Sequence, residues 1–234
     1  MGRPGVPVTR GRFAVAIPAY EAEPTIQRVV RRTLALHPDI LVVDDGSEDR
    51  TGEAARACGV RVLAHAVNQG KGRALRTAFH ELFGAGYDAV VTIDADGQHP
   101  PEEIPKLLGP WREGADLVLG TRSHLFAAMS AVRRTSNGTS SWLISHVAGA
   151  DLPDCQTGFR LYTRRLIEAT GFPEPRFEAE SAVLVRAARS GFRLAGVPVR
   201  LDHADGRATS HYRPVVDSLR IAGAVVRARI ESLA

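Results

Sequence analysis

The first half of the chain alternates short apolar runs with longer segments whose apolar positions recur every three or four residues. Short apolar runs are typical of buried strands, and the longer periodic segments are typical of amphipathic helices. Five strands are predicted here, at 13–17, 40–43, 60–64, 89–94 and 116–120, and helices are predicted at 24–36, 51–58, 71–83 and from 100 onward. This alternation predicts an α/β fold, a mainly parallel sheet with helices on both faces.

The second half loses this rhythm. The elements predicted there are helical structure over 125–149 with a break at 137–138, a strand at 159–162, a helix at 178–190, a strand at 193–199 and an amphipathic helix at 215–233. We find no internal repeat and no low-complexity linker, so we expect a single domain over 12–213. A disordered lead over 1–11 precedes it, and a C-terminal amphipathic helix over 214–234 packs on or beside it.

Composition narrows the classes of protein. The chain has 234 residues, 44% of them hydrophobic and 24% charged, and no stretch approaches the roughly 20 apolar residues that span a bilayer. With a polar start that does not resemble a signal peptide, we expect a cytoplasmic protein. Lys71 and Lys106 are the only lysines, so arginine supplies nearly all the positive charge, which favours bidentate contacts with phosphate. The charges are dispersed, and we expect no nucleic-acid partner.

Two carboxylates end the fourth predicted strand. Side chains alternate along extended backbone, so Asp94, Asp96 and Gln98 should converge on one point. Oxygen ligands of this kind suit Mg²⁺ or Mn²⁺, with substrate phosphates and water completing the shell. An ordinary turn with helix-capping acids is the alternative. A calcium loop fits less well because Gly97 follows Asp96 directly, without the third oxygen ligand that such loops carry.

Other polar segments follow neighbouring strands, at the edge where open parallel sheets bind ligands. Asp44 and Asp45 could accept hydrogen bonds from a base or a ribose, although a helix-capping turn through Ser47 or Asp49 explains the segment as well. Tyr20 could stack on a base or simply pack. The segment 68–72 brings glycines and a lysine to the same edge, but it lacks the spacing of known phosphate loops, so a plain turn stays open.

Six segments together resemble a known family. They are Ile17–Tyr20, Val42–Ser47, Asn68–Gly72, Ile93–Gln98, Gly120–Arg122 and Asp154–Arg160. Their order resembles that of family 2 glycosyltransferases, in particular the polyprenyl-phosphate branch that includes dolichyl-phosphate mannose synthases, over about residues 12–215. The resemblance implies a GT-A fold, a GDP- or UDP-hexose donor, Mg²⁺ or Mn²⁺, a polyprenyl-phosphate acceptor and inversion at the anomeric carbon.

The resemblance also implies roles for individual residues. Around the nucleotide it places Pro18, Tyr20, Glu21, Asp44, Asp45, Lys71, Asp94 and Ala95, and on the metal and diphosphate Asp94, Asp96 and Gln98. It places Arg122, Arg133, Arg134 and Asn137 at the acceptor phosphate, and Asp154, Arg160 and Asp96 at the reaction centre. A loop with Arg207, Ser210, His211 and Arg213 would lie over the diphosphate. The family commonly has Asn and Glu after the tyrosine, where this chain has Glu21 and Ala22, which leaves the base open.

The identity of the acceptor decides whether a base is needed. A phosphate acceptor is largely dianionic at neutral pH and needs none. A hydroxyl acceptor needs a carboxylate, and Asp154 is the candidate, with capping or pairing to Arg160 as the alternative. Two other classes stay open: a noncatalytic nucleotide-sugar-binding subunit, and a haloacid-dehalogenase-type phosphatase, whose motif resembles 93–97 but normally lies on the first strand and continues with Thr.

A lipid acceptor requires contact with the membrane surface. The segment 125–147, with Phe126, Met129, Trp142, Leu143 and Ile144, could supply an interfacial face, or these residues could be core. The C-terminal helix carries Arg220, Arg227 and Arg229 and could bind the bilayer, a second copy or a membrane-protein partner, or present a solvated basic face. The hypothesis is a peripheral protein on the cytoplasmic face.

Overall fold

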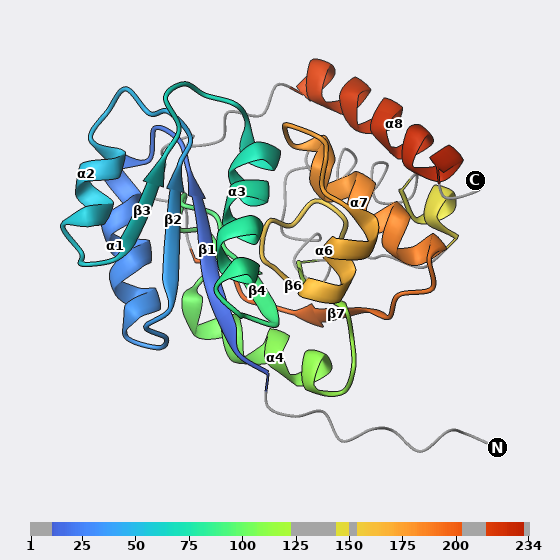
Figure 1. Ribbon diagram of the computed structural model, residues 1–234, viewed down its shortest axis with the longest axis horizontal. Helices are drawn as coiled ribbons and strands as arrows, with labels where there is room; N and C mark the ends of the chain where they lie inside the picture. The colour runs from blue at the N-terminus through green and yellow to red at the C-terminus, as the bar shows by residue number, and fades with distance from the viewer. Residues whose placement is uncertain (1–10, 123–143, 150–153, 203–213, 232–234) are drawn as a thin grey trace.

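Seven strands form one sheet in the computed structural model, which describes residues 11–122, 144–149, 154–202 and 214–231 (Figure 1). The strands are β1 (Phe13–Ala19), β2 (Ile40–Asp44), β3 (Arg61–Ala64), β4 (Ala89–Thr92), β5 (Leu117–Thr121), β6 (Arg160–Thr163) and β7 (Leu194–Pro198). Their order across the sheet is β3-β2-β1-β4-β6-β5-β7. Only β6 runs against its neighbours β4 and β5, so the prediction of a mainly parallel sheet is confirmed.

Helices cover both faces of this sheet, as predicted. They are α1 (Glu23–Leu34), α2 (Thr51–Arg56), α3 (Lys71–Gly84), α4 (Ile104–Arg112) with the short 3₁₀ turn η1 (Pro101–Glu103) before it, α6 (Arg164–Thr170), α7 (Glu178–Arg189) and α8 (Pro214–Glu231). The helices α1, α2 and α4 pack on one face, and α3, α6, α7 and α8 belong to the other layer (Figure 1).

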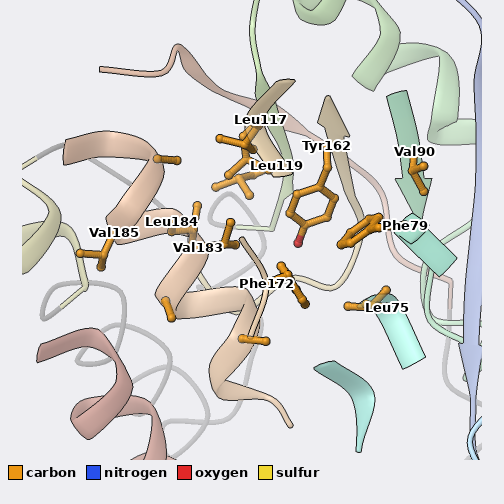
Figure 2. Packing of buried hydrophobic residues seen from close by; sticks show 14 of the residues in the cluster. Leu75, Phe79, Val90, Leu117, Leu119, Tyr162, Phe172, Val183, Leu184 and Val185 are labelled. Atoms are coloured by element: carbon orange, nitrogen blue, oxygen red, sulfur yellow. The ribbon is translucent and has the colours of Figure 1, made fainter. Parts of the chain in front are cut away.

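Strand alternation builds the two cores. In β1, Ala14 and Ala16 face the layer of α3 and α7, while Val15 and Ile17 face α1 and α4. Figure 2 shows the first of these cores, where aromatic rings bring sheet and helices together. The ring of Phe79 on α3 lies edge-on to that of Tyr162 on β6, with 5.1 Å between the centroids. All of the strands except the edge strands β3 and β7 are therefore buried on both faces.

The element bounds differ from the sequence prediction at two informative places. β4 ends at Thr92, so Asp94 lies beyond the strand, and Ala95 and Asp96 form a turn. The alternation argument for the two carboxylates was therefore wrong, although both still lie at the predicted edge of the sheet. α6 was not predicted, because seven residues are too few to show a helical period; it begins after Thr163, whose Oγ1 accepts a hydrogen bond from the backbone N–H of Leu166 (3.3 Å).

The C-terminal helix packs into the core through one side only. Ile221, Ala224, Val225 and Ala228 of α8 are buried in the same cluster as α7. Ile144, for which an interfacial role was one expectation, is also buried there, and the rest of that expected face lies outside the described residues. Within the described part of the chain, no helix combines the length and apolar character needed to traverse a bilayer.

Candidate active site

A pocket of about 570 Å³ opens beyond the carboxyl ends of β1, β2 and β4. Of the residues expected around a nucleotide, its walls include Pro18, Tyr20, Glu21, Asp45, Lys71, Asp94 and Ala95, together with Asp96. The opposite wall was not predicted: it comes from Arg176 and Phe177 before α7 and from Asp217 and Arg220 on α8. The position agrees with the general rule that open α/β sheets bind ligands at this edge.

Two carboxylates of unequal acidity lie in this pocket. Burial works to raise the pKa of Asp94, but the neighbouring ammonium of Lys71 outweighs it and holds that pKa below its usual value. Burial, reinforced by the negative charge of Asp94, raises the pKa of Asp96 to about 6. The backbone N–H of Gln98 donates to Oδ1 of Asp96 (2.9 Å) and fixes the turn. Two oxygen ligands that repel each other favour a cation between them.

The donor set fits a divalent cation that is shared with a substrate. Within the described residues, no group of three or more His, Cys, Asp and Glu side chains is arranged to hold a metal ion alone. Mg²⁺ and Mn²⁺ accept one or two carboxylates and take their other ligands from phosphate and water. Gln98 is not among the residues that line the pocket, so the structure brings together only Asp94 and Asp96 of the predicted metal set.

Lys71 connects the acidic turn to α7. It is the first residue of α3, and its Nζ lies 2.7 Å from Oδ1 of Asp94 and 2.9 Å from Oε2 of Glu180. Burial disfavours the ammonium form, but the two carboxylates outweigh burial and raise the pKa of Lys71, so it stays charged. Glu180 was not predicted as a site residue, because acids are common in the first turn of any helix, where they interact favourably with the helix dipole.

The absence of a side chain at Gly158 leaves room for the carboxylate of Asp94. A Cβ atom at this position would lie 2.2 Å from Oδ2 of Asp94 and 2.6 Å from Nζ of Lys71. The backbone before β6 therefore packs directly against the carboxylate, and no larger residue fits without displacing it. Steric contact with Asp94 and Lys71 therefore explains why the segment 154–160 has a glycine at this position.

Arg160 is not brought to the pocket, contrary to the expectation from the resemblance. Its side chain is fully buried, and its guanidinium donates to the backbone carbonyl oxygens of Thr157 (2.6 Å), Glu180 (2.6 Å) and Cys155 (2.7 Å). Because each of its three nitrogens donates to one of these carbonyl oxygens, the side chain ties the loop before β6 to α7. Its position supports a structural role rather than contact with a substrate.

Asp154 pairs with Arg122, not with Arg160. Oδ2 of Asp154 accepts hydrogen bonds from the backbone N–H (2.9 Å) and Nε (2.8 Å) of Arg122, and Oδ1 accepts from Nη2 (3.0 Å). Burial works to raise the pKa of Asp154, but these bonds outweigh it and hold the pKa below its usual value. A buried carboxylate with a low pKa is a poor general base. Its evident task is to hold Arg122, whose charge also lowers the pKa of Asp94.

His99 completes the buried layer behind the acidic turn. Its ring stacks on Phe159 with 5.4 Å between centroids, and its Nε2 is 3.5 Å from Oγ1 of Thr157. Burial lowers the pKa of His99 to about 4, so the ring is neutral at pH 7.

The two acids at the end of β2, Asp44 and Asp45, form their hydrogen bonds with the neighbouring loops. Asp45 accepts hydrogen bonds from the backbone N–H groups of Gln69 (3.0 Å) and Gly70 (2.7 Å) and from Nδ1 of His65 (2.6 Å). Asp44 is buried, accepts from the backbone N–H of Ser47 (3.1 Å) and is not among the pocket-lining residues. Asp44 therefore closes the turn after β2, but the helix-capping alternative is not confirmed, because α2 begins only at Thr51 and has no side-chain cap. Asp45 holds the glycine loop that precedes Lys71.

Tyr20 and Glu21 form the pocket wall after β1. Glu21 has a left-handed backbone (φ 50°), which non-glycine residues seldom adopt. Its backbone N–H donates to Oγ of Ser47 (3.0 Å), and its Oε1 accepts from the backbone N–H of Glu48 (2.6 Å). The loops after β1 and β2 therefore brace each other. The other predicted residues, namely Arg133, Arg134, Asn137, Arg207, Ser210, His211 and Arg213, lie outside the described residues.

The chain is similar to known proteins over most of its length. Residues 14–171 match Glycosyl transferase family 2. The undecaprenyl-phosphate mannosyltransferase of Micrococcus luteus is 33% identical over 202 residues, which are 80% of this chain and 82% of that protein. The undecaprenyl-phosphate 4-deoxy-4-formamido-L-arabinose transferase of Yersinia enterocolitica is 31% identical over 170 residues, and the match spans 68% of this chain but only 50% of that relative.

Solved structures share the fold. Glucosyl-3-phosphoglycerate synthase from Mycobacterium tuberculosis, in complex with Mn²⁺, UDP and phosphoglyceric acid, superposes with a TM-score of 0.72 and 23% identity, covering 95% of this chain and 78% of that one. The same enzyme with Mg²⁺ and UDP gives a TM-score of 0.70, with 23% identity and coverage of 95% and 79%. At 23% sequence identity, the structural similarity shows a shared fold and nothing more.

Proposed function

Because this chain belongs to glycosyl transferase family 2, we propose that it is a glycosyltransferase that moves a hexose from a GDP- or UDP-sugar to a polyprenyl phosphate with inversion. The observation that carries the proposal is the carboxylate pair Asp94 and Asp96, flanked by the permanently charged Lys71 in a pocket at the carboxyl ends of the strands. The undecaprenyl-phosphate mannosyltransferase of Micrococcus luteus, aligned over most of both chains, supports this acceptor class.

Asp94 and Asp96 are the residues that would hold Mg²⁺ or Mn²⁺. When bound, the cation would neutralise charge on the diphosphate of the leaving nucleotide. The raised pKa of Asp96 supports this role, because burial and the charge of Asp94 both disfavour its ionised carboxylate, which a bound cation would stabilise. Lys71 stays positive beside them and would face the same diphosphate.

Transfer needs no covalent intermediate. An oxygen of the acceptor phosphate forms a bond to the anomeric carbon while the bond from that carbon to the diphosphate oxygen breaks, and the nucleoside diphosphate leaves with the electron pair. The acceptor attacks from the face opposite the leaving group, which inverts the configuration. An acceptor phosphate, with a second pKa of about 6, is already anionic and transfers no proton to the protein.

The pairing of Asp154 favours a phosphate acceptor over a hydroxyl acceptor. The one carboxylate proposed as a base for a hydroxyl is buried, holds Arg122 through three hydrogen bonds and has a lowered pKa. Arg122 is instead held rigidly as a cation, which suits an anionic acceptor. The tight pairing therefore supports an acceptor site that orients charge and does not abstract a proton.

The test is release of nucleoside diphosphate from a panel of nucleotide sugars, with Mn²⁺, Mg²⁺ or EDTA, and with or without a short polyprenyl phosphate. We expect metal-dependent release that the lipid phosphate stimulates. Asp96→Asn should reduce the rate at least about 100-fold, because it removes one of two metal oxygens, while the exposed Glu53→Gln on α2 should not change it. Release stimulated only by an acceptor with a sugar hydroxyl would overturn the proposed phosphate acceptor. Tight binding of a nucleotide sugar without turnover would indicate a noncatalytic subunit.

A further inference from the structure

α8 carries an apolar face that nothing in the described structure covers. Val216, Leu219, Val226 and Ile230 are 44%, 70%, 52% and 61% exposed. They are four of the six large hydrophobic side chains that are exposed within the described residues. The helix packs beside α7 (Figure 1), and the side chains on its opposite side are buried, so the apolar exposure is confined to one face. Scattered exposed apolar residues need no explanation, but a concentration on one helix does.

These side chains form one continuous stripe. Their positions, with Gly223 between them, are spaced by three, four, three and four residues, which returns to the same face of a helix at every turn. From Val216 to Ile230 the stripe is about 21 Å long at 1.5 Å per residue. We call these five residues the α8 stripe.

Arginines border the α8 stripe on both sides. At 100° per residue, Arg220 and Arg227 fall along one edge and Arg229 along the other. The helix has two acids within the described residues: Asp217 is buried and lies 3.5 Å from Arg220, and Glu231, at the C-terminal end of the same edge as Arg220, lies 3.8 Å from Arg186. An apolar band between cations is complementary to an anionic lipid surface.

The same charges disfavour a second copy of the chain as the occupant. Two copies of the α8 stripe packed face to face would bring arginines of both copies to the same edges, while the two acids of the helix already face arginines of their own copy, Asp217 facing Arg220 and Glu231 facing Arg186. An interface between copies would need opposite charges at these flanking positions.

The α8 stripe begins at the rim of the pocket. Asp217 and Arg220 line the pocket, and Val216 and Leu219 lie next to them in the first turns of the same helix. A surface that binds the stripe therefore lies next to the wall that α8 contributes to the pocket of Asp96. The polyprenyl chain of the proposed acceptor must stay in lipid while its phosphate enters the pocket.

We propose that the α8 stripe binds an anionic lipid surface and holds the mouth of the pocket against the lipid headgroups. Its consequence for turnover rests on the proposed function, whereas the binding itself does not. α8 then serves as the docking element for the membrane and also as one wall of the pocket.

The experiment measures sedimentation of the protein with vesicles of phosphatidylcholine alone or mixed equally with phosphatidylglycerol, without donor or metal. We expect binding only to the anionic vesicles. Leu219→Glu combined with Ile230→Glu should weaken it at least tenfold, because both side chains leave the apolar band. Arg227→Gln should weaken it about fivefold at low salt. Leu36→Glu, which changes an apolar side chain of similar exposure (49%) after α1, is the matched control and should bind normally.

Three further measurements separate the outcomes. Thermal unfolding should show the variants as stable as the wild type, because the altered side chains are exposed. Turnover with acceptor embedded in vesicles should fall in the Leu219→Glu and Ile230→Glu double variant, while turnover with a short soluble acceptor should not. Equal vesicle binding by the double variant and the wild type would overturn the proposal, as would a wild-type dimer that the double variant dissociates. Stripe-dependent vesicle binding without lipid-stimulated release would instead contradict the proposed function alone.

Discussion

Replacing Asp154 by asparagine tests whether this carboxylate holds Arg122 or acts as a base. Asp154 accepts three hydrogen bonds from Arg122, at 2.9, 2.8 and 3.0 Å, and its side chain is completely buried. Asparagine has nearly the same shape but only one acceptor oxygen, and its amide N–H groups would face one of the guanidinium donors. Asp154→Asn therefore leaves a largely buried arginine without its counter-charge.

The expected cost is large. Removing one partner of a buried ion pair destabilises a protein by about 3–5 kcal/mol. The side chain of Arg122 keeps 13% exposure and can recover part of its hydration, so we expect the lower end, about 3 kcal/mol. In a domain of this size each kcal/mol lowers Tm by about 2–4 °C, which gives a loss of about 6–12 °C. Since the guanidinium is then free to move, KM for the polyprenyl phosphate should rise about tenfold or more.

Thermal unfolding and initial rates across acceptor concentration and pH provide the assay. Asp116→Asn is the matched control: Asp116 is also buried beside β5 and pairs with Arg165, but it lies before the strand, at the end of the sheet away from the pocket. It should lower Tm without changing KM for the acceptor. If Asp154→Asn instead lowered kcat by about 100-fold at constant KM and removed the acidic limb of the pH–rate profile, Asp154 would be a base and our argument would be refuted.

Three further outcomes test the packing around the acidic turn. Gly158→Ala should weaken Mn²⁺-dependent nucleotide binding about tenfold, measured by calorimetry, because the new methyl displaces the carboxylate of Asp94; unchanged affinity would contradict the steric argument. Arg160→Lys should destabilise the fold by about 3 kcal/mol in urea unfolding, since a single ammonium cannot reproduce the three carbonyl contacts, and an effect below 1 kcal/mol would show that they are dispensable. His99 has a folded pKa of about 4, below the value of about 6.5 in an unfolded chain, so it contributes stability above pH 6.5 that is lost as pH falls toward 4. The free energy of unfolding of the wild type relative to His99→Gln should therefore fall by about 3 kcal/mol between pH 7 and pH 4, and a difference independent of pH would show that the imidazole is not buried in its neutral form.

Much of the fold was predictable because the first half of the chain obeys local rules. Apart from the edge strand β3, the apolar runs there become strands buried on both faces, and the periodic segments between them become the covering helices. The edge of the sheet that carries the pocket followed from parallel topology alone. That is why the placement of Asp94 and Asp96 survived an error in the end of β4: the carboxyl edge is the same whether the strand ends at Thr92 or two residues later.

The pairing of charges was not predictable, because it depends on the direction of one short strand. β6 runs against β4 and β5 and lies between them, so the segment that precedes it emerges at the same edge where its neighbours end. This reversal brings Asp154 to Arg122 and Gly158 to Asp94, and it buries Arg160 at the first position of the strand. The four residues of β6 have the same sequence pattern whether the strand runs parallel or antiparallel to its neighbours. A sequence can therefore show that 154–160 carries functional charges, but the partner of each charge follows only once the reversed strand has been placed.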